Sequence, residues 1–275
     1  MLAESKLYKT LRYVMLVLAA AFVIIPLVPI LFMAFKTGVE FRETSVFKSP
    51  ANWFNLYNFA YAIRVGNLFS ALLTTLIVLA VSLFFSVNFS CMVSFVLQRF
   101  DFRGKKLVMG AYLMTMFIPV VTTQVVVFRI IYAMGLINNI GSIILLYSGV
   151  GIVDIYIVMN ILNTIPKSLD EAGLLDGAGY FRIYFSIILP LLKPAIVTLA
   201  VIKGIGIYND FYIPNLYLIR GAQTLTVALY RFFSGLSTPF EVVSAAVLLA
   251  TIPMLVLFLF CQRYIYNGLA GAVKS

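Results

Sequence analysis

The segment NTIPKSLDEAGLLDGAGYFRIYFSIILPLLKP, residues 163–194, interrupts a chain that is otherwise mostly apolar. It carries the carboxylates Asp170, Glu171 and Asp176, and long apolar runs stand on both sides of it. The apolar runs decide the fold class. The polar segment between them raises the question of what it contacts.

Composition identifies an integral membrane protein. Of the 275 residues, 63% are hydrophobic and 11% are charged, and the mean hydropathy is +1.04, whereas soluble domains carry about 25% charged residues. A helix needs about 20 apolar residues to cross a bilayer core. The sequence therefore predicts an all-α membrane protein with six transmembrane helices, at residues 13–35, 68–97, 107–131, 140–161, 194–217 and 242–261.

These helices are expected to form a single transmembrane domain over residues 1–275. The run at residues 13–35 is an extra N-terminal helix that we expect to be retained as an anchor, because it is long, contains prolines and lacks a small-residue cleavage site. Residues 68–261 form the core, and residues 163–193 form its one long cytoplasmic insertion.

Charge placement predicts the orientation. More Lys and Arg residues lie on the inner side when both termini are cytoplasmic, and positively charged short loops stay inside. The net charge of +10 then reflects topology and attraction to anionic lipid rather than nucleic-acid binding. Cys91 and Cys261 lie far apart and the chain has no histidine, so we expect neither a disulfide framework nor a metal site.

The polar segment predicts two short helices. Pro166 should end the preceding helix, and Ser168 with Glu171 forms a Ser-x-x-Glu capping box that starts a helix over residues 169–176. A second short helix is expected over residues 180–189, before the prolines that lead into the next span.

The first short helix should present one small, smooth face. Leu169, Ala172, Gly173 and Asp176 are three or four residues apart, and Gly177 is a natural stop. A helix lying on the inner lipid surface is the alternative, but such helices are usually rich in Lys and Arg. We therefore favour docking into a groove on another protein.

Three stretches resemble one family. Glu171-Ala172-Gly173, then Gly177, then Ile187-x-Leu189-Pro190, resembles the Glu-Ala-Ala, Gly, Ile-x-Leu-Pro loop of binding-protein-dependent ABC importer permeases, with glycine in place of the second alanine. Tyr208-Asn209-Asp210-Phe211 is similar to a fifth-helix motif of their sugar-importing members, with tyrosine in place of tryptophan. The tail that ends in Gly271-Ala272-Val273-Lys274 is similar to that of the smaller permease subunit of maltose and oligosaccharide importers.

The resemblance implies a type I ABC importer permease fold in the plasma membrane of a prokaryote. It implies a non-enzymatic transport subunit that pairs with a second permease and two ATPase subunits, and an extracytoplasmic binding protein that delivers a sugar or oligosaccharide for alternating-access import. ATP and Mg would be held by the ATPases, so no cofactor is expected on this chain, which also lacks a phosphate-binding lysine loop.

The resemblance also implies site residues. The residues that would couple to the ATPase are Leu169, Asp170, Glu171, Ala172, Gly173, Asp176 and Gly177, and the tail that would contact the ATPases is Gly271, Ala272, Val273 and Lys274. Candidates for the substrate pathway are Tyr208, Asn209, Asp210 and Tyr212, which either contact sugar or set a helix bend.

Three charges fall inside predicted spans and should face protein or water, because charge is costly in hydrocarbon. Lys203 either pairs with Asp154 or contacts substrate, and Asp210 shares the helix face of Lys203. An ion-coupled secondary transporter is the rival interpretation, since Asp154 and Asp210 could serve coupling, but it leaves the segment at residues 163–193 without a role. Glycerol phosphate or another solute is a further alternative to sugar.

Two other features carry expectations. Serines at four-residue spacing should line one face of the second helix, either for close helix packing or along a pore: Ser82, Ser86, Ser90 and Ser94. Residues 220–241 should contact the binding protein, with Phe232 and Phe233 exposed.

Overall fold

The computed structural model describes residues 6–234 and 238–273, and within these ranges every regular element is a helix. The described chain divides into two compact units. One comprises residues up to Phe69 together with Ala228–Leu255, and the other comprises Ser70–Val227 together with residues from Val256 onward.

The first unit contains α1 (Lys6–Ile24), α2 (Leu27–Phe35), α3 (Gly38–Glu43), α4 (Tyr57–Val65) and the beginning of α16 (Phe240–Val273). Hydrogen bonds of two buried polar side chains, Lys36 and Asn58, hold this unit together around the end of α2. The fully buried Lys36 donates through Nζ to Thr44 Oγ1 at 2.9 Å and to the Ser45 carbonyl at 2.7 Å. Asn58 ties α4 to the end of α2 by donating to the carbonyl oxygens of Ala34 and Lys36.

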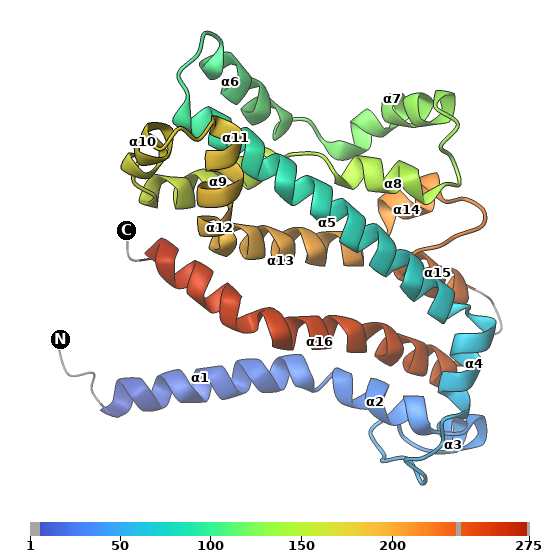
Figure 1. The fold of residues 1–275 in the computed structure, drawn as a ribbon. Coiled ribbons are helices and arrows are strands. Elements are labelled where there is room, and N and C mark those ends of the chain that lie inside the picture. The colour runs from blue at the N-terminus through green and yellow to red at the C-terminus, as the bar shows by residue number, and fades with distance from the viewer. Residues whose placement is uncertain (1–5, 235–237, 274–275) are drawn as a thin grey trace. The chain divides into compact units, whose positions relative to one another are not determined.

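The second unit holds the remaining helices, of which α5 and α15 reach across its boundary. They are α5 (Leu68–Arg99), α6 (Lys105–Thr115), α7 (Val120–Ala133), α8 (Ile140–Tyr147), α9 (Ile152–Thr164), α10 (Ser168–Leu175), α11 (Tyr180–Ile183), the π-helix η1 (Tyr184–Ile188), α12 (Leu189–Leu191), α13 (Lys193–Asn209), α14 (Tyr212–Tyr217) and α15 (Leu225–Ser234). In Figure 1, α10 and α11 lie beside the C-terminal end of α5.

The prediction of an all-α membrane protein is confirmed. Three helical stretches are long and apolar enough to cross a membrane, Tyr8–Phe35, Leu68–Arg99 and Phe240–Leu259. Three bent helix pairs pass the same test together, so the described chain has up to six spans if each pair is one span. The bends measure 105° between α6 and α7, 48° between α8 and α9, and 71° between α11–α12 and α13.

The prediction that the fifth span is continuous over residues 194–217 is wrong. Helix α13 ends at Asn209, Asp210 has extended backbone angles, and α14 begins at Tyr212. Pro214 explains part of the break, because proline supplies no backbone N–H to a continuing helix. The largely apolar sequence does not reveal this interruption, because apolar residues are compatible both with a continuous helix and with a buried turn.

The serine face of α5 packs against the break between α8 and α9. All four serines are buried. Ser86 Oγ donates to the Gly149 carbonyl at 3.1 Å, and Ser94 Oγ donates to the Ile155 carbonyl at 3.3 Å. Close helix packing, one of the two expectations for this face, is therefore confirmed in the described structure.

Candidate functional site

The polar connector at residues 163–193 folds around α10, which ends in a tight glycine turn. Gly177 has φ +79°, its N–H donates to the Leu174 carbonyl at 3.0 Å, and the Ala178 N–H donates to the Gly173 carbonyl at 2.9 Å. This pair of hydrogen bonds is the Schellman arrangement, in which glycine adopts the left-handed conformation just after a helix. The predicted stop at Gly177 is confirmed.

The predicted capping box is wrong. Ser168 is the first residue of α10, and the preceding Lys167 has helical backbone angles and makes no side-chain cap. The Glu171 N–H instead donates to the Lys167 carbonyl at 3.1 Å. Because Lys167 already turns into the helix, Ser168 lacks the extended backbone that a capping serine needs.

Alanine at Gly177 is expected to destabilise the end of α10 by about 1 kcal/mol, because a Cβ disfavours the left-handed backbone. Hydrogen–deuterium exchange of residues 168–176 should become about fivefold faster. Gly179→Ala is the matched control, since Gly179 has φ −74° and no atom within 4 Å of an added Cβ. Equal exchange in the two variants would contradict the assignment.

An ion pair holds one face of α10 against the end of α5. Arg99, the last residue of α5, places Nε 2.8 Å from Asp170 Oδ2 and donates through Nη2 to the Ile165 carbonyl at 2.9 Å. The other carboxylate oxygen, Asp170 Oδ1, is buried without a hydrogen-bond partner among the described residues. Burial raises the pKa of Asp170 above its ordinary value, and the charge of Arg99 opposes this shift. Asp170 therefore fixes α10 to α5.

Gly173 lies on the same inward face, which corrects its predicted place on the small outward face. It is buried, and an added Cβ would lie 3.0 Å from Ile183 Cγ1 and 3.2 Å from Ile187 Cδ1. The close approach that glycine permits here is to α11 and η1 of the same chain. A larger residue would push α10 away from them.

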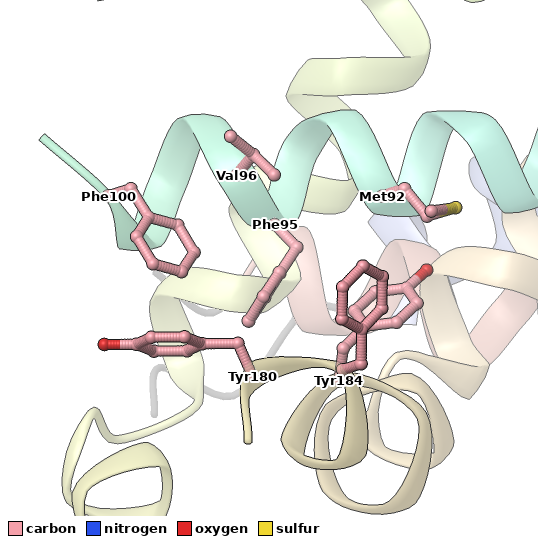
Figure 2. A pocket seen from close by; sticks show the side chains of 7 residues that line it. Met92, Phe95, Val96, Phe100, Tyr180 and Tyr184 are labelled. Carbon is pink, nitrogen blue, oxygen red and sulfur yellow. The ribbon is translucent and has the colours of Figure 1, made fainter. Parts of the chain in front are cut away.

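Aromatic rings hold the second half of the connector against α5. Figure 2 shows Phe95 of α5, and Phe100 just after its end, pointing towards Tyr180 and Tyr184. The ring centroids of Phe100 and Tyr180 are 4.9 Å apart, and those of Phe95 and Tyr184 are 5.2 Å apart. An apolar pocket of about 160 Å³ lies among these rings, Met92, Val96 and Phe181. Sequence reasoning missed this cluster, because its halves are some eighty residues apart and each looks like ordinary membrane sequence.

The rest of α10 and the turn that ends it are exposed. Leu169, Glu171, Ala172, Asp176 and Gly177 lie there, as do two leucines that the sequence interpretation did not single out, Leu174 and Leu175. Leu175 is the last residue of α10 and is 89% exposed. The helix itself is held by the ion pair of Asp170 with Arg99 and by the close packing of Gly173. Leu174 and Leu175 together leave neighbouring apolar side chains exposed on an otherwise polar connector, which makes this surface a candidate for contact with a partner.

The predicted tail site lies at the edge of the described chain. Gly271, Ala272 and Val273 belong to the last turn of α16, and Lys274 lies outside the described residues.

A buried charge cluster lies at the break between α8 and α9. Lys203 Nζ is 2.6 Å from Asp154 Oδ2 and donates to the Gly149 carbonyl at 3.1 Å. The same Asp154 oxygen accepts from the Gly151 N–H at 2.8 Å, and Ser90 Oγ lies 3.5 Å away. The structural pair left open by the sequence is therefore formed, and Asp154 also caps α9.

Asp210 bridges the break between α13 and α14. Its Oδ2 accepts from the Tyr147 hydroxyl at 2.8 Å, and its Oδ1 accepts from the backbone N–H of Tyr212 at 2.8 Å. Tyr208 is buried, with its carbonyl bonded to Thr226 Oγ1, while the Asn209 and Tyr212 side chains are exposed. Of the four pathway candidates, Asp210 thus has both carboxylate oxygens engaged within the chain.

Asp210→Ala is expected to lower the free energy of unfolding by about 1–2 kcal/mol, because it removes a helix cap and leaves a tyrosine hydroxyl unpaired. Asp210→Asn should cost less, since an amide oxygen can still accept from Tyr212. Thermal unfolding of the purified chain in detergent measures both. Asp101→Ala is the control, because Asp101 pairs with Lys105 at an exposed position. A loss no larger than the control's would contradict the structural role.

The segment expected to meet the binding protein is only partly exposed. Phe233 is 40% exposed, but Phe232 is buried, so its predicted exposure is wrong. Phe232 packs near Gly66 of the same unit, where an added Cβ would meet its ring at 3.3 Å.

These features define a multi-pass membrane protein in which a polar connector is held against α5 and leaves one face of α10 exposed. Comparison with known proteins agrees. A melibiose/raffinose/stachyose import permease protein of Bacillus subtilis is 31% identical over 255 residues, covering 91% of each chain. A probable starch degradation products transport system permease protein of Thermoanaerobacterium thermosulfurigenes is 32% identical, also covering 91% of each chain.

A solved structure shares the fold. A chain of a bacterial ABC transporter involved in the import of the acidic polysaccharide alginate matches with a TM-score of 0.84 and 19% identity, covering 96% of this chain and 98% of that one. The family model of binding-protein-dependent transport system inner membrane components matches residues 90–270. The chain belongs to this family, and it is a multi-pass protein of the plasma membrane.

Proposed function

We propose that this chain is one permease subunit of an ATP-driven importer that passes a sugar or oligosaccharide from an extracytoplasmic binding protein into the cytoplasm by alternating access. The family description supports the binding protein. The names of the relatives, which include melibiose, raffinose and starch degradation products, support a saccharide over glycerol phosphate or another solute. A second permease and two ATPase subunits complete the transporter, and ATP with Mg is held by the ATPases.

The two-faced helix α10 is the observation that carries this proposal. Asp170 and Gly173 fasten its inner face to α5, α11 and η1. Leu175 is 89% exposed on the other side, and Glu171 and Asp176 place negative charge near it. A rigid helix with an apolar contact and an acidic rim suits a cleft with basic edges on an ATPase.

The ATPase-contacting residues divide by role. Those that reach the ATPase are Leu169, Glu171, Ala172, Leu174, Leu175 and Asp176. Asp170, Gly173 and Gly177 position the helix, and the tail residues Gly271, Ala272, Val273 and Lys274 approach the interface between the two ATPases.

Both termini and the connector lie in the cytoplasm in this proposal. The excess of Lys and Arg in the loops on that side supports the orientation. One span, formed by α1 and α2, separates α3 and α4 from the N-terminus, so these two helices lie on the extracytoplasmic side.

The charged groups within the spans favour this function over ion-coupled transport. A coupling carboxylate must bind and release its ion. Asp154 pairs with Lys203 at 2.6 Å, and Asp210 accepts from Tyr147 and Tyr212. Both carboxylates are therefore committed to contacts within the described chain.

Purification of the tagged chain from its native membrane tests the proposal. An ATPase with a Walker A loop and a second permease should co-purify and be identified by mass spectrometry. Proteoliposomes that contain this complex and its binding protein should then import raffinose or maltotriose only with ATP inside. Uptake that is independent of ATP but driven by an ion gradient would overturn the proposal.

A further inference from the structure

A polar cavity lies in the first unit. It occupies about 330 Å³ between the start of α3, the start of α4 and the start of α16, elements that are labelled in Figure 1. The side chains that give it chemical character are Thr37, Asn55, Tyr57, Asn58, Tyr61 and Glu241. The volume is at the lower end of the range of about 300–1,000 Å³ that small-molecule pockets occupy.

Glu241 is the buried acceptor of this cavity. Its side chain lines the cavity and is only 7% exposed, yet within residues 6–234 and 238–273 it makes no hydrogen bond and no ion pair. Its carboxylate oxygens are not among the fully enclosed polar atoms, so what exposure the residue retains is towards the cavity. Gly38 makes room for it, because an added Cβ there would lie 2.8 Å from Glu241 Oε1. The arrangement leaves hydrogen-bonding capacity directed at whatever fills the cavity.

Two tyrosines add an aromatic wall. Tyr57 and Tyr61 are one turn apart on α4, with ring centroids 6.1 Å apart and planes tilted by 38°. Tyr57 is 67% exposed and Tyr61 is 36% exposed, so both rings have open surface. Aromatic faces offer apolar contact area, and the tyrosine hydroxyls offer a polar group at the edge.

The charges nearby favour a neutral ligand. Arg42 Nη1 lies 4.0 Å from the Cβ position of Gly38, the same point that Glu241 Oε1 approaches. The buried ammonium group of Lys36 adds positive charge next to Thr37. The carboxylates of Glu40 and Glu43 on α3 oppose these two cations, so the surroundings of Glu241 carry little net charge. The hydroxyl groups of a neutral ligand can donate to Glu241 while its C–H face lies on the tyrosines.

We propose that this cavity is a saccharide-binding site that takes one sugar residue through hydroxyl hydrogen bonds to Glu241 and stacking on Tyr57 and Tyr61. The site rests on the proposed function for its orientation, which puts it on the extracytoplasmic side. There it holds one end of an oligosaccharide outside the spans, separately from Tyr208, Asn209, Asp210 and Tyr212.

Saturation-transfer-difference NMR with the full chain in nanodiscs tests this site, using raffinose and maltotriose as probes. At least one probe should give a signal, and Glu241→Gln and Tyr57→Ala should each weaken its binding at least about tenfold. Glu43→Gln, a change at an exposed carboxylate on α3, should leave binding unchanged. Thermal unfolding of each variant separates lost binding from lost folding.

Two results would overturn the site. One is that neither probe gives a signal with the unaltered chain. The other is that the signal persists in Glu241→Gln and Tyr57→Ala. If these two variants also lose cross-linking to the binding protein, the cavity receives a basic side chain of that protein instead of a sugar. ATP-dependent import of raffinose or maltotriose alongside either result would leave the proposed function standing, whereas loss of ATP dependence would refute that function independently of this site.

Discussion

Leu175→Ala is expected to weaken binding of the ATPase at least tenfold and to reduce ATP-driven import to a small fraction of its normal rate. Leu175 is 89% exposed in the structure, and full burial of a leucine in a partner's cleft contributes about 1.5–3 kcal/mol. Glu171→Ala should act in the same direction by removing the adjacent charge. Co-purification measures ATPase binding, and proteoliposomes measure ATP hydrolysis and uptake together.

The matched control is Leu107→Ala. Leu107 is 77% exposed and lies near the start of α6, outside the connector, so its truncation should leave ATPase binding unchanged. Normal ATPase binding and normal uptake in Leu175→Ala would remove α10 as the contact. Normal binding with ATP hydrolysis but without uptake would instead show that Leu175 transmits movement rather than affinity.

Replacement of Lys203 by methionine is expected to destabilise the chain by about 3–5 kcal/mol, because it leaves the Asp154 carboxylate buried without its counter-ion. The melting temperature in detergent should fall by on the order of 10 °C. Asp154→Asn alone should also destabilise, since it leaves the Lys203 ammonium group without its carboxylate. Fluorescence-detected thermal unfolding measures both variants.

The double variant Lys203→Met with Asp154→Asn provides the decisive comparison. Removing both charges should recover much of the loss of either single variant, because no uncompensated ion remains buried. The amide of asparagine can still accept from the Gly151 N–H and preserve the cap of α9. Strictly additive losses would show that the two residues stabilise the chain independently, which the 2.6 Å contact does not allow.

The sequence was sufficient for several features that depend on local chemistry. Apolar run length predicted where the apolar stretches lie, although three of them are bent helix pairs. Gly177 predicted the end of α10, because few other residues tolerate the backbone angles found there. The four-residue spacing of serines predicted the packed face of α5. Each of these depends on residues that are neighbours along one helix.

Features built from distant residues escaped prediction. The contact of Arg99 with Asp170 joins positions that no pattern links, and Gly173 was assigned to the wrong face because spacing alone cannot say which side of α10 meets α11. The capping box failed because the backbone at Lys167 was already helical. The break at Asp210 was missed because α13 and α14 read as one apolar run.

The attachment of α10 to the last residue of α5 would transmit a movement of α10 along the whole of α5. Helix α5 has 32 residues and is thus a rod of about 48 Å. If an ATPase that grips α10 tilts this rod by about 5° at the Arg99 end, the far end swings by about 4 Å, more than the width of a water molecule. In the proposed orientation, a small rotation of α5 at its cytoplasmic end would therefore displace its extracytoplasmic end by several ångströms.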